Sequence, residues 1–303
     1  MKPLIDGDII AYSVASVADG KRYVAPDGHE ERYKKDMAKY CERKGIDLLD
    51  VETNFKPEKI EYALHSVKQM VKSVLDHFDE VENYSIFISP EEGNFRESIG
   101  TILKYKGNRV DMRRPYHLPN CREYLVEQWT AEVVEGQEAD DAMGIAQFEQ
   151  FSQVAEGNFD NSNYTTCICT RDKDLDMVPG WHYNWETDKR YFVTEVQAWR
   201  NFYCQLLTGD STDNILGLFG VGKNSQLVKQ VKQMDDSDEM FSHVAQQYFK
   251  RFGNYWATFL LENARLLWIR READEMWEPS ASQQQRLEAD TEGKVQYNPE
   301  ETS

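Results

Sequence analysis

The sequence predicts an α/β protein in which helices flank a mostly parallel central sheet. Over residues 1–195, short apolar and β-branched runs are separated by longer segments, two of them with the apolar pattern of a helix, which is typical of a sheet whose strands are connected by helices. From residue 196 onward the pattern is helical. We therefore expect an α/β domain over residues 1–195 and a helical region over 196–278. Residues 279–303 contain few apolar groups, which predicts a disordered tail.

Apolar and β-branched residues predict the strands in chain order. Residues 4–10 form an apolar stretch broken by Asp-Gly-Asp, and we expect a buried strand that meets solvent at these acids. Residues 84–88 and 165–170 are rich in residues that favour buried strands and predict a second and a third one. Residues 181–193 show an alternating pattern with a polar break at Thr187-Asp188, which indicates a hairpin.

Helices are predicted between and after these strands. Apolar residues recur at spacings of three and four over residues 58–78, and a second helix is expected from Asp140 towards Glu156. Residues 20–56 are polar and lack a period, so we expect a long irregular insertion there. Three glycines within residues 217–222 separate two helices by a tight turn.

Composition and charge exclude several classes of protein. With 40% hydrophobic and 29% charged residues, the chain of 303 residues is expected to fold. It contains no apolar run of about 18 residues, so no membrane span is expected. The net charge of −18 argues against a protein that coats nucleic acid through bulk charge. It leaves room for a local basic groove, or for an acidic site filled by metal ions.

Cysteine usage indicates a cytoplasmic protein. The five cysteines form no Cys-x-x-Cys pair and only six His accompany them, so a zinc site is not expected. Reduced thiols are typical of the cytoplasm. Asp6 interrupts the apolar stretch that a secretory signal peptide would need.

Four clusters of carboxylates stand out along the chain. Each alone is explained by helix capping or turn formation. Three of them, however, fall at junctions expected on the carboxyl edge of a parallel sheet, where open α/β folds place their sites. The clusters are Asp6-Gly7-Asp8, Glu138-Ala139-Asp140-Asp141, Asp172-Lys173-Asp174, and the segment Gly209-Asp210-Ser211-Thr212-Asp213-Asn214.

Convergence of these clusters would require cations. About eight carboxylates in one cleft repel each other, and without His or Cys nearby the natural counter-ions are Mg²⁺ or Mn²⁺. Two such ions roughly 3.5–4 Å apart can clamp the attacking and leaving oxygens of a phosphodiester. The acids therefore predict metal-assisted phosphodiester hydrolysis.

These motifs, in this order, resemble the 5′-nuclease (flap endonuclease) family, which includes bacteriophage 5′→3′ exonucleases and the nuclease domain of bacterial DNA polymerase I. The resemblance reaches from the start of the chain to about residue 230. The chain has no polymerase region and therefore resembles the stand-alone phage type. It implies a PIN-like fold with a helical arch near residues 93–122 and a helix–three-turn–helix element near 207–232. The implied activity is a 5′→3′ exonuclease on duplex DNA, with flap cleavage or RNA-primer removal as related activities.

The resemblance also implies a ligand set for two Mg²⁺ ions, which Mn²⁺ could replace. The first ion would lie near Asp6, Glu138 and Asp140. The second would lie near Asp140, Asp172, Asp174 and Asp213, with Asp141 and Asp210 acting through water or outer contacts. One departure is Ser89, which stands where the family has an Asp ahead of Phe95-Arg96, unless Asp8, Glu91 or Glu92 substitutes for it.

Residues 93–122 are locally basic, with seven Lys or Arg against two acids, and this excess of five predicts a phosphate-binding segment. The stretch Tyr105-Lys106-Gly107-Asn108-Arg109 resembles the family's Tyr-Lys-x-x-Arg motif, which implies that Lys106 and Arg109 act catalytically by holding the scissile phosphate. The remaining candidate DNA-binding residues of this segment are Arg96, Lys104, Arg113 and Arg114.

Gly220, Gly222 and Lys223 are expected to bind the DNA duplex, because glycines let the backbone approach a phosphate. In the family a K⁺ ion often lies at this turn. The expected partner is therefore DNA with a duplex region and a 5′ end or flap, bound by a monomer in the cytoplasm, which is the host's if the chain is phage-encoded.

Two alternatives stay open on the sequence alone. A PIN-like ribonuclease shares the acidic cleft but would not require the glycine-rich turn. A catalytically weak, structure-specific DNA-binding protein is suggested by Ser89 at the position of a usual acid. The preference for exonuclease or flap substrates also stays open.

Overall fold

A computed structural model describes residues 1–110, 112–155 and 164–285. Its centre is a six-stranded sheet in the order β6-β5-β1-β7-β8-β9. All neighbouring strands are parallel except the β8–β9 hairpin, so the predicted fold class is confirmed. The strands are β1 (Lys2–Asp6), β5 (Ser85–Ile88), β6 (Glu132–Val133), β7 (Thr166–Cys169), β8 (Gly180–Asn184) and β9 (Lys189–Val193).

Strand register brings the predicted motifs to one edge of this sheet. Leu4 of β1 lies between Ser85 of β5 and Ile168 of β7, so the three strands run side by side in the same direction. Asp6, Ser89 and Thr170 consequently lie at or just beyond their carboxyl ends. This is the edge at which open α/β sheets form their sites.

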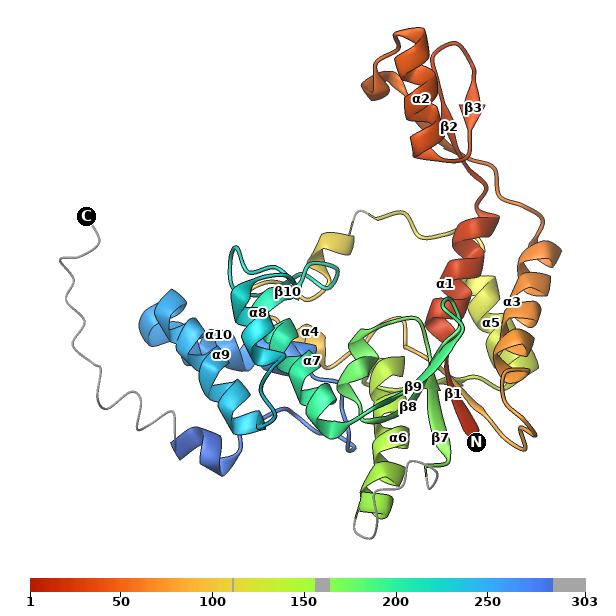
Figure 1. Cartoon of the computed structure of the whole chain (residues 1–303). Helices are drawn as coiled ribbons and strands as arrows, with labels where there is room; N and C mark the ends of the chain where they lie inside the picture. Colours follow the sequence, from red (N-terminus) through yellow and green to blue (C-terminus); the bar gives the residue numbers. More distant parts are fainter. Residues whose placement is uncertain (111, 156–163, 286–303) are drawn as a thin grey trace, which may run out of the picture.

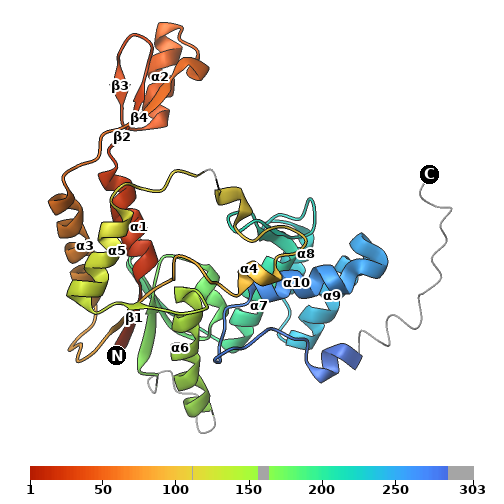
Figure 2. The same ribbon diagram turned by 180° about the vertical axis from the view of Figure 1, so that it is seen from behind.

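Both faces of the sheet are covered by helices (Figures 1 and 2). Alternate residues of the strands point to opposite faces: Ile5, Ile86 and Cys169 pack with one set of helices, while Leu4 and Ile168 pack with the other. The first set is α1 (Gly7–Ala18), α3 (Ile60–Leu75) and α5 (Leu118–Trp129). The second face is covered by α6 (Ala139–Ala155), and α7 (Glu195–Thr208), α9 (Ser237–Phe252) and α10 (Trp256–Leu267) extend the same apolar cluster away from the sheet.

The helical region after residue 195 shares its core with the sheet. Met143 of α6, Phe202 of α7 and Phe241 of α9 belong to one buried apolar cluster. The predicted boundary at residues 195 and 196 therefore does not coincide with a break in this core. Shorter elements complete this part of the chain: α4 (Arg96–Ile99), η2 (Gly107–Arg109), η4 (Asp174–Met177), β10 (Gly209–Asp210), β11 (Ile215–Leu216), α8 (Gln226–Val231) and η5 (Gly253–Tyr255).

The insertion at residues 20–56 is ordered, so the prediction of an irregular segment was wrong. Three antiparallel strands in the order β3-β2-β4 pack with one helix and project from the body (Figures 1 and 2). Its core is small, with Ala25, Met37 and Cys41 buried, so its helix shows too few apolar positions for a visible period. The elements are β2 (Lys21–Val24), β3 (Glu30–Glu31), α2 (Lys34–Lys44), η1 (Leu48–Asp50) and β4 (Glu52–Phe55).

The first strand ends at the acidic motif as predicted, but Asp6 is buried instead of meeting solvent, because a helix begins at Gly7. The Asp6 carboxylate accepts a hydrogen bond from the Ile9 amide at 2.9 Å and caps this helix. A side chain at Gly7 would come within 2.7 Å of the Phe87 carbonyl oxygen. Only glycine therefore lets the helix start against β5.

The predicted tail does not start at residue 279. Residues 281–285 are helical, and buried Gln283 donates a hydrogen bond to the Tyr203 hydroxyl at 3.3 Å. The disorder prediction was therefore wrong for 279–285, while 286–303 lie outside the described residues. Among the helices that are described, none is long and apolar enough to cross a membrane.

Candidate functional site

Asp6 and its neighbours form the innermost part of the acidic edge. The Asp6 side chain is 2% exposed, and besides capping α1 it accepts a hydrogen bond from the Thr170 hydroxyl at 2.7 Å. The Thr170 hydroxyl in turn accepts from the Asp172 amide at 3.0 Å. The ends of β1 and β7 are thus tied together, and the first and third acidic motifs lie next to each other.

Ser89 performs a structural role at this edge. Its hydroxyl accepts a hydrogen bond from the Ala139 amide at 2.9 Å and so caps α6. Its own amide donates to Asp8 at 2.8 Å, and Arg122 pairs with Asp8 and bonds the Ser89 carbonyl. In this structure the Asp8 carboxylate is engaged by Arg122 and the Ser89 amide.

Asp174 and Asp210 meet from two different elements. Asp174 begins η4, its amide donates to Asp172 at 3.0 Å, and its carboxyl accepts from Gln205 of α7 at 3.1 Å. The Asp210 carboxyl group lies close enough to Asp174 for its charge to raise the pKa of Asp174. Asp210 holds its own loop by accepting from the Thr212 amide at 2.7 Å.

The loop between β10 and β11 places Asp213 over the same pocket. Its carboxylate accepts a hydrogen bond from the buried Tyr105 hydroxyl at 2.9 Å, and Tyr105 also bonds Glu138 at 3.0 Å. The tight hairpin requires Gly209, since a side chain there would come within 2.1 Å of the Gly217 nitrogen. The second and fourth motifs are therefore bridged by one tyrosine.

These contacts enclose a pocket of about 300 Å³, part of which is open solvent. Most of its polar lining is acidic, and Arg96, Tyr105 and Gln205 supply the rest. Its acidic members come from three of the four motifs: Glu138, Asp140, Asp174, Asp210 and Asp213. Asp6 and Asp172 adjoin the pocket through Asp140, on whose charge they act.

Burial and mutual repulsion change how these acids ionise. Burial is the main cause that raises the pKa of Asp6 to about 7, and the charges of Asp8 and Asp172 add to it. Burial followed by Asp172 and Asp210 likewise raises the pKa of Asp174 to about 7. The pKa of Asp140 is raised well above its usual range, again by burial and then by its acidic neighbours. Ionised together, these groups destabilise one another.

The residue types suit a hard divalent cation, although no complete coordination cage is formed. Carboxylate oxygens without His or Cys are the ligands that Mg²⁺ and Mn²⁺ prefer. Within residues 1–110, 112–155 and 164–285, however, no three acidic, His or Cys side chains are grouped closely enough to hold one ion. Glu138 and Asp213 are occupied by basic side chains, so ion binding requires these carboxylates to exchange partners.

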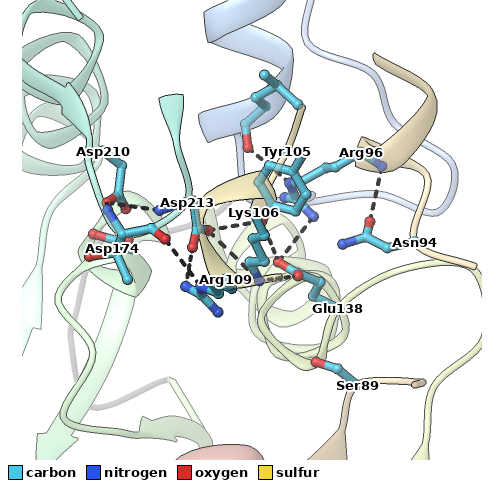
Figure 3. A network of polar contacts seen from close by, with 12 residues as sticks. Ser89, Asn94, Arg96, Tyr105, Lys106, Arg109, Glu138, Asp174, Asp210 and Asp213 are labelled. Carbon is cyan, nitrogen blue, oxygen red and sulfur yellow. Dashed lines mark hydrogen bonds and ion pairs between the residues drawn. The ribbon is translucent and has the colours of Figure 1, made fainter. Parts of the chain in front are cut away.

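The basic side chains at the pocket are Lys106 and Arg109 (Figure 3). Lys106 pairs with Glu138, and its backbone amide donates to the Asp213 carbonyl at 2.9 Å. Arg109 pairs with the Asp213 carboxylate and donates to the Thr212 carbonyl at 3.1 Å. Burial lowers the pKa of Lys106, but Glu138 and Asp213 more than offset this, so its pKa is raised and the ammonium stays charged.

Charge is unbalanced around the pocket. Of the seven carboxyl groups that adjoin it, Glu138 and Asp213 pair with Lys106 and Arg109, and Glu138 also lies 3.7 Å from Arg96. Seven acids against Lys106 and Arg109 leave an excess of five. Arg96 does not change this balance because Asp141 neutralises it. The seven acids are Asp6, Glu138, Asp140, Asp172, Asp174, Asp210 and Asp213.

Arg96 and Asp141 have different positions from those expected. Arg96 is 1% exposed and forms a bidentate pair with Asp141, at 2.6 and 2.8 Å. The Asp141 carboxylate also accepts from the backbone amides of Glu138 and Arg270, at 3.1 Å each. Arg96 lines the pocket, but its guanidinium is buried and engaged by Asp141, and Asp141 is not among the residues that line the pocket. Both residues instead hold the site's scaffold.

The other predicted DNA-binding residues lie at the surface. Lys104, Arg113 and Arg114 are exposed, although Arg113 pairs with Asp19. Gly220, Gly222 and Lys223 lie in the exposed loop between β11 and α8, and a side chain at either glycine would meet nothing within 4 Å among the described residues. Next to them Phe219 is 88% exposed, a feature that its sequence context does not reveal.

The raised pKa values predict an unusual pH dependence of stability in the absence of divalent ions. Carboxyls of the unfolded chain ionise near pH 4, so between about pH 4 and pH 7 the folded protein retains protons on Asp6 and Asp174 that the unfolded chain has lost. The contribution of these two groups to the free energy of unfolding therefore rises as pH falls from about 8 to about 6.

Thermal melts in EDTA test this expectation by comparing the wild type with Asp174→Asn. Burial lowers the pKa of His182, so this residue makes both proteins less stable as pH falls. Because its effect is the same in both, the difference between their melting temperatures isolates Asp174. The wild type should gain stability relative to Asp174→Asn as pH falls. A difference that stays constant between pH 8 and pH 6 would contradict this assignment.

Comparisons with known proteins return similar structures only. No protein-family model matches the sequence, and no curated protein matches it. A bacteriophage T5 protein co-crystallised with metal ions is 15% identical with a TM-score of 0.47, over 88% of this chain and 85% of that chain.

Two further solved structures are nucleases of the kind that the acidic motifs resemble. A variant of the bacteriophage T5 flap endonuclease, in a pseudo-enzyme–product complex with DNA and metal ions, is 16% identical with a TM-score of 0.46, over 69% of this chain and 80% of that chain. A T5 5′-exonuclease variant is 14% identical with a TM-score of 0.42 over the same shares, 69% and 80%.

Proposed function

We propose that this chain is a metal-dependent 5′-nuclease that hydrolyses phosphodiester bonds of duplex DNA from the 5′ end. The observation that carries the proposal is the pocket at the carboxyl edge of the sheet, which five carboxyl groups line and which Asp6 and Asp172 adjoin, while Lys106 and Arg109 pair with two of these seven acids. Such an excess of buried acid is costly unless cations enter, and a bound metal ion is the usual solution in enzymes that act on phosphates.

Two Mg²⁺ ions, or Mn²⁺ in their place, are the cofactors of the proposal. The ions would polarise the phosphate and lower the pKa of water, which is the chemistry that divalent metals supply to phosphodiesterases. The residues that would hold the first ion are Asp6, Glu138 and Asp140. Those for the second are Asp140, Asp172, Asp174 and Asp213, with Asp210 in support next to Asp174, on whose pKa its charge acts.

The basic side chains of the pocket would then bind the substrate. When a 5′ end enters, Lys106 and Arg109 can exchange Glu138 and Asp213 for the scissile phosphate and offset the charge that develops on it. The water oxygen forms a bond to phosphorus as the bond to the departing 3′ oxygen breaks. Both basic residues lie at the mouth of the pocket, partly exposed at 30% and 39%, and are therefore accessible to DNA.

Surface residues outside the pocket would hold the rest of the DNA. Lys104 and Arg114 are exposed cations on the segment that leads from the pocket. The loop with Gly220, Gly222 and Lys223 offers an exposed backbone that a duplex phosphate could approach, with K⁺ as a bridging ion. In this proposal the protein acts as a monomer in the cytoplasm, that of the host if it is phage-encoded.

A single gel assay tests the proposed activity. The substrates are 5′-labelled blunt duplex DNA, duplex DNA with a 5′ flap, and single-stranded RNA, each incubated with Mg²⁺, with Mn²⁺ or with EDTA. We expect both DNA substrates to be cleaved near their 5′ ends with either metal and to stay intact in EDTA.

The same assay separates the alternatives. Preferential cleavage of the single-stranded RNA would favour a PIN-like ribonuclease. Structure-specific DNA binding without hydrolysis in either metal would favour a catalytically weak binding protein, for which one observation exists: Ser89 caps α6 where an acid could have bound metal.

A further inference from the structure

The insertion at residues 21–55 is joined to the body by a closed neck. The Glu58 amide donates to the Ala18 carbonyl at 2.8 Å, and β2 pairs with β4 from Lys21 and Phe55 onward. Between these points Gly20 has a φ of +58°, and a side chain there would come within 2.1 Å of the Lys56 carbonyl oxygen. The two segments of the neck therefore lie so close together that only glycine fits at position 20.

A distant segment of the chain is fastened to this neck. We name residues 112–117 the distal leg, because they follow the pocket-lining stretch and lead to α5 (Figures 1 and 2). The guanidinium of Arg113 pairs with the carboxylate of Asp19, which is 3% exposed, and lies 3.7 Å from the centre of the Phe55 ring. The Tyr116 amide donates to the same Asp19 carboxylate at 2.8 Å.

A second contact lies one residue further along the distal leg. Buried His117 bonds the Glu58 carbonyl oxygen through Nε2 at 2.7 Å. Three residues of the distal leg therefore contact the neck, and they do so through a buried carboxylate, an aromatic face and a backbone carbonyl. A bidentate pair that also carries a cation–π contact is a stronger attachment than an isolated surface ion pair.

The other end of this stretch is attached to the acidic pocket. Asn108 donates to the Ser211 carbonyl at 2.7 Å, and Asn214 donates to the Lys104 carbonyl at 2.9 Å. Lys106 and Arg109 are held at Glu138 and Asp213 as described above. The basic stretch thus starts on the pocket and reaches the neck of the insertion, with both ends fixed.

We propose that Asp19 and Phe55 are positioning residues that hold the distal leg and thereby determine which DNA 5′ ends reach the acidic pocket. The proposal rests on the proposed nuclease function. Lys104 and Arg114 of this stretch are exposed cations, so a single-stranded 5′ flap would present more of its phosphates to the stretch than a 5′ end at a nick, whose strand is still paired. The two substrates should therefore respond differently when the distal leg is released.

Limited trypsin digestion measures the attachment without any activity. Cleavage after Arg109 or Arg113 requires local opening of the stretch, and its rate follows the population of the open form. In Asp19→Asn and in Phe55→Leu we expect mass spectrometry to show faster cleavage at these positions by about fivefold, the factor equivalent to one lost ion pair in the first variant and one lost cation–π contact in the second. Phe55→Tyr keeps the aromatic face and should restore the wild-type rate.

Steady-state kinetics with flap and nicked duplex DNA measure the consequence. The ratio of kcat/KM for flap over nick should change by about fivefold in Asp19→Asn and Phe55→Leu, mainly through KM, and return in Phe55→Tyr. Lys56→Gln is the matched control, since Lys56 lies in the same neck but its side chain pairs with Glu30 of β3 and should change neither readout.

The outcomes separate this inference from the proposed function. An unchanged trypsin pattern in both variants, or an unchanged flap-to-nick ratio in an active enzyme, overturns it. A wild type that cleaves no DNA overturns the proposed function instead, and the digestion still decides whether Asp19 and Phe55 hold the distal leg.

Discussion

Replacing Asp172 or Asp174 by Asn is expected to abolish DNA cleavage while leaving DNA binding largely intact. Asn keeps the size of the side chain but removes the charge that a divalent ion requires. Metal stabilisation of a reacting phosphate contributes several kcal/mol, so kcat should fall by roughly a thousandfold or more, at 1.36 kcal/mol for each factor of ten. Single-turnover cleavage of 5′-labelled duplex in Mg²⁺ measures this loss.

The loss has to be separated from misfolding and from weaker binding. Asp274→Asn makes the same chemical change at a fully exposed side chain and should cleave at the wild-type rate. DNA affinity, measured by fluorescence anisotropy in EDTA, should be unchanged or slightly tighter in both pocket variants, because each has one less negative charge facing the phosphates. Turnover close to wild type in either variant would remove the basis for the proposed function.

Convergence of the acidic motifs could be predicted because it depends on short-range features. Asp6 ends one strand and Asp172 follows another, and the carboxyl ends of adjacent parallel strands must meet at one edge. Glu138 and Asp140 start the helix that packs beside them. Strand and helix patterns in the sequence are sufficient to place these groups.

The partner of each charge could not be predicted in the same way. Asp140 and Asp141 are adjacent and chemically identical, yet Asp140 faces the pocket while Asp141 is buried against Arg96, 45 residues earlier in the chain. Only the packing of α4, α6 and the residues after α10 decides which of the two carboxylates lines the pocket and which one pairs with Arg96. The prediction of an irregular insertion was wrong because α2 buries only Met37 and Cys41. Two buried positions are too few to reveal a helical period in the sequence.

Breaking the Arg96–Asp141 pair is expected to produce the largest loss of stability among these variants. Both side chains are almost completely buried, and Arg96 also donates to the carbonyls of Leu266 and Trp268, at 2.9 and 2.6 Å. Burial alone would raise the pKa of Asp141, but the guanidinium holds it below its usual value, so the carboxylate is ionised. Arg96→Met would leave this charge without its partner.

An unpaired buried charge of this kind costs about 3–5 kcal/mol, so urea unfolding of Arg96→Met should show a loss of that size. Lys39→Met, which removes an exposed ion pair with Asp36, should cost less than about 1 kcal/mol. The double variant Arg96→Met with Asp141→Leu removes both charges and should recover much of the loss, since apolar replacement of a whole buried pair is often neutral. If Arg96→Met alone were as stable as Lys39→Met, the pair would not be what holds α4, α6 and the end of α10 around the acidic pocket.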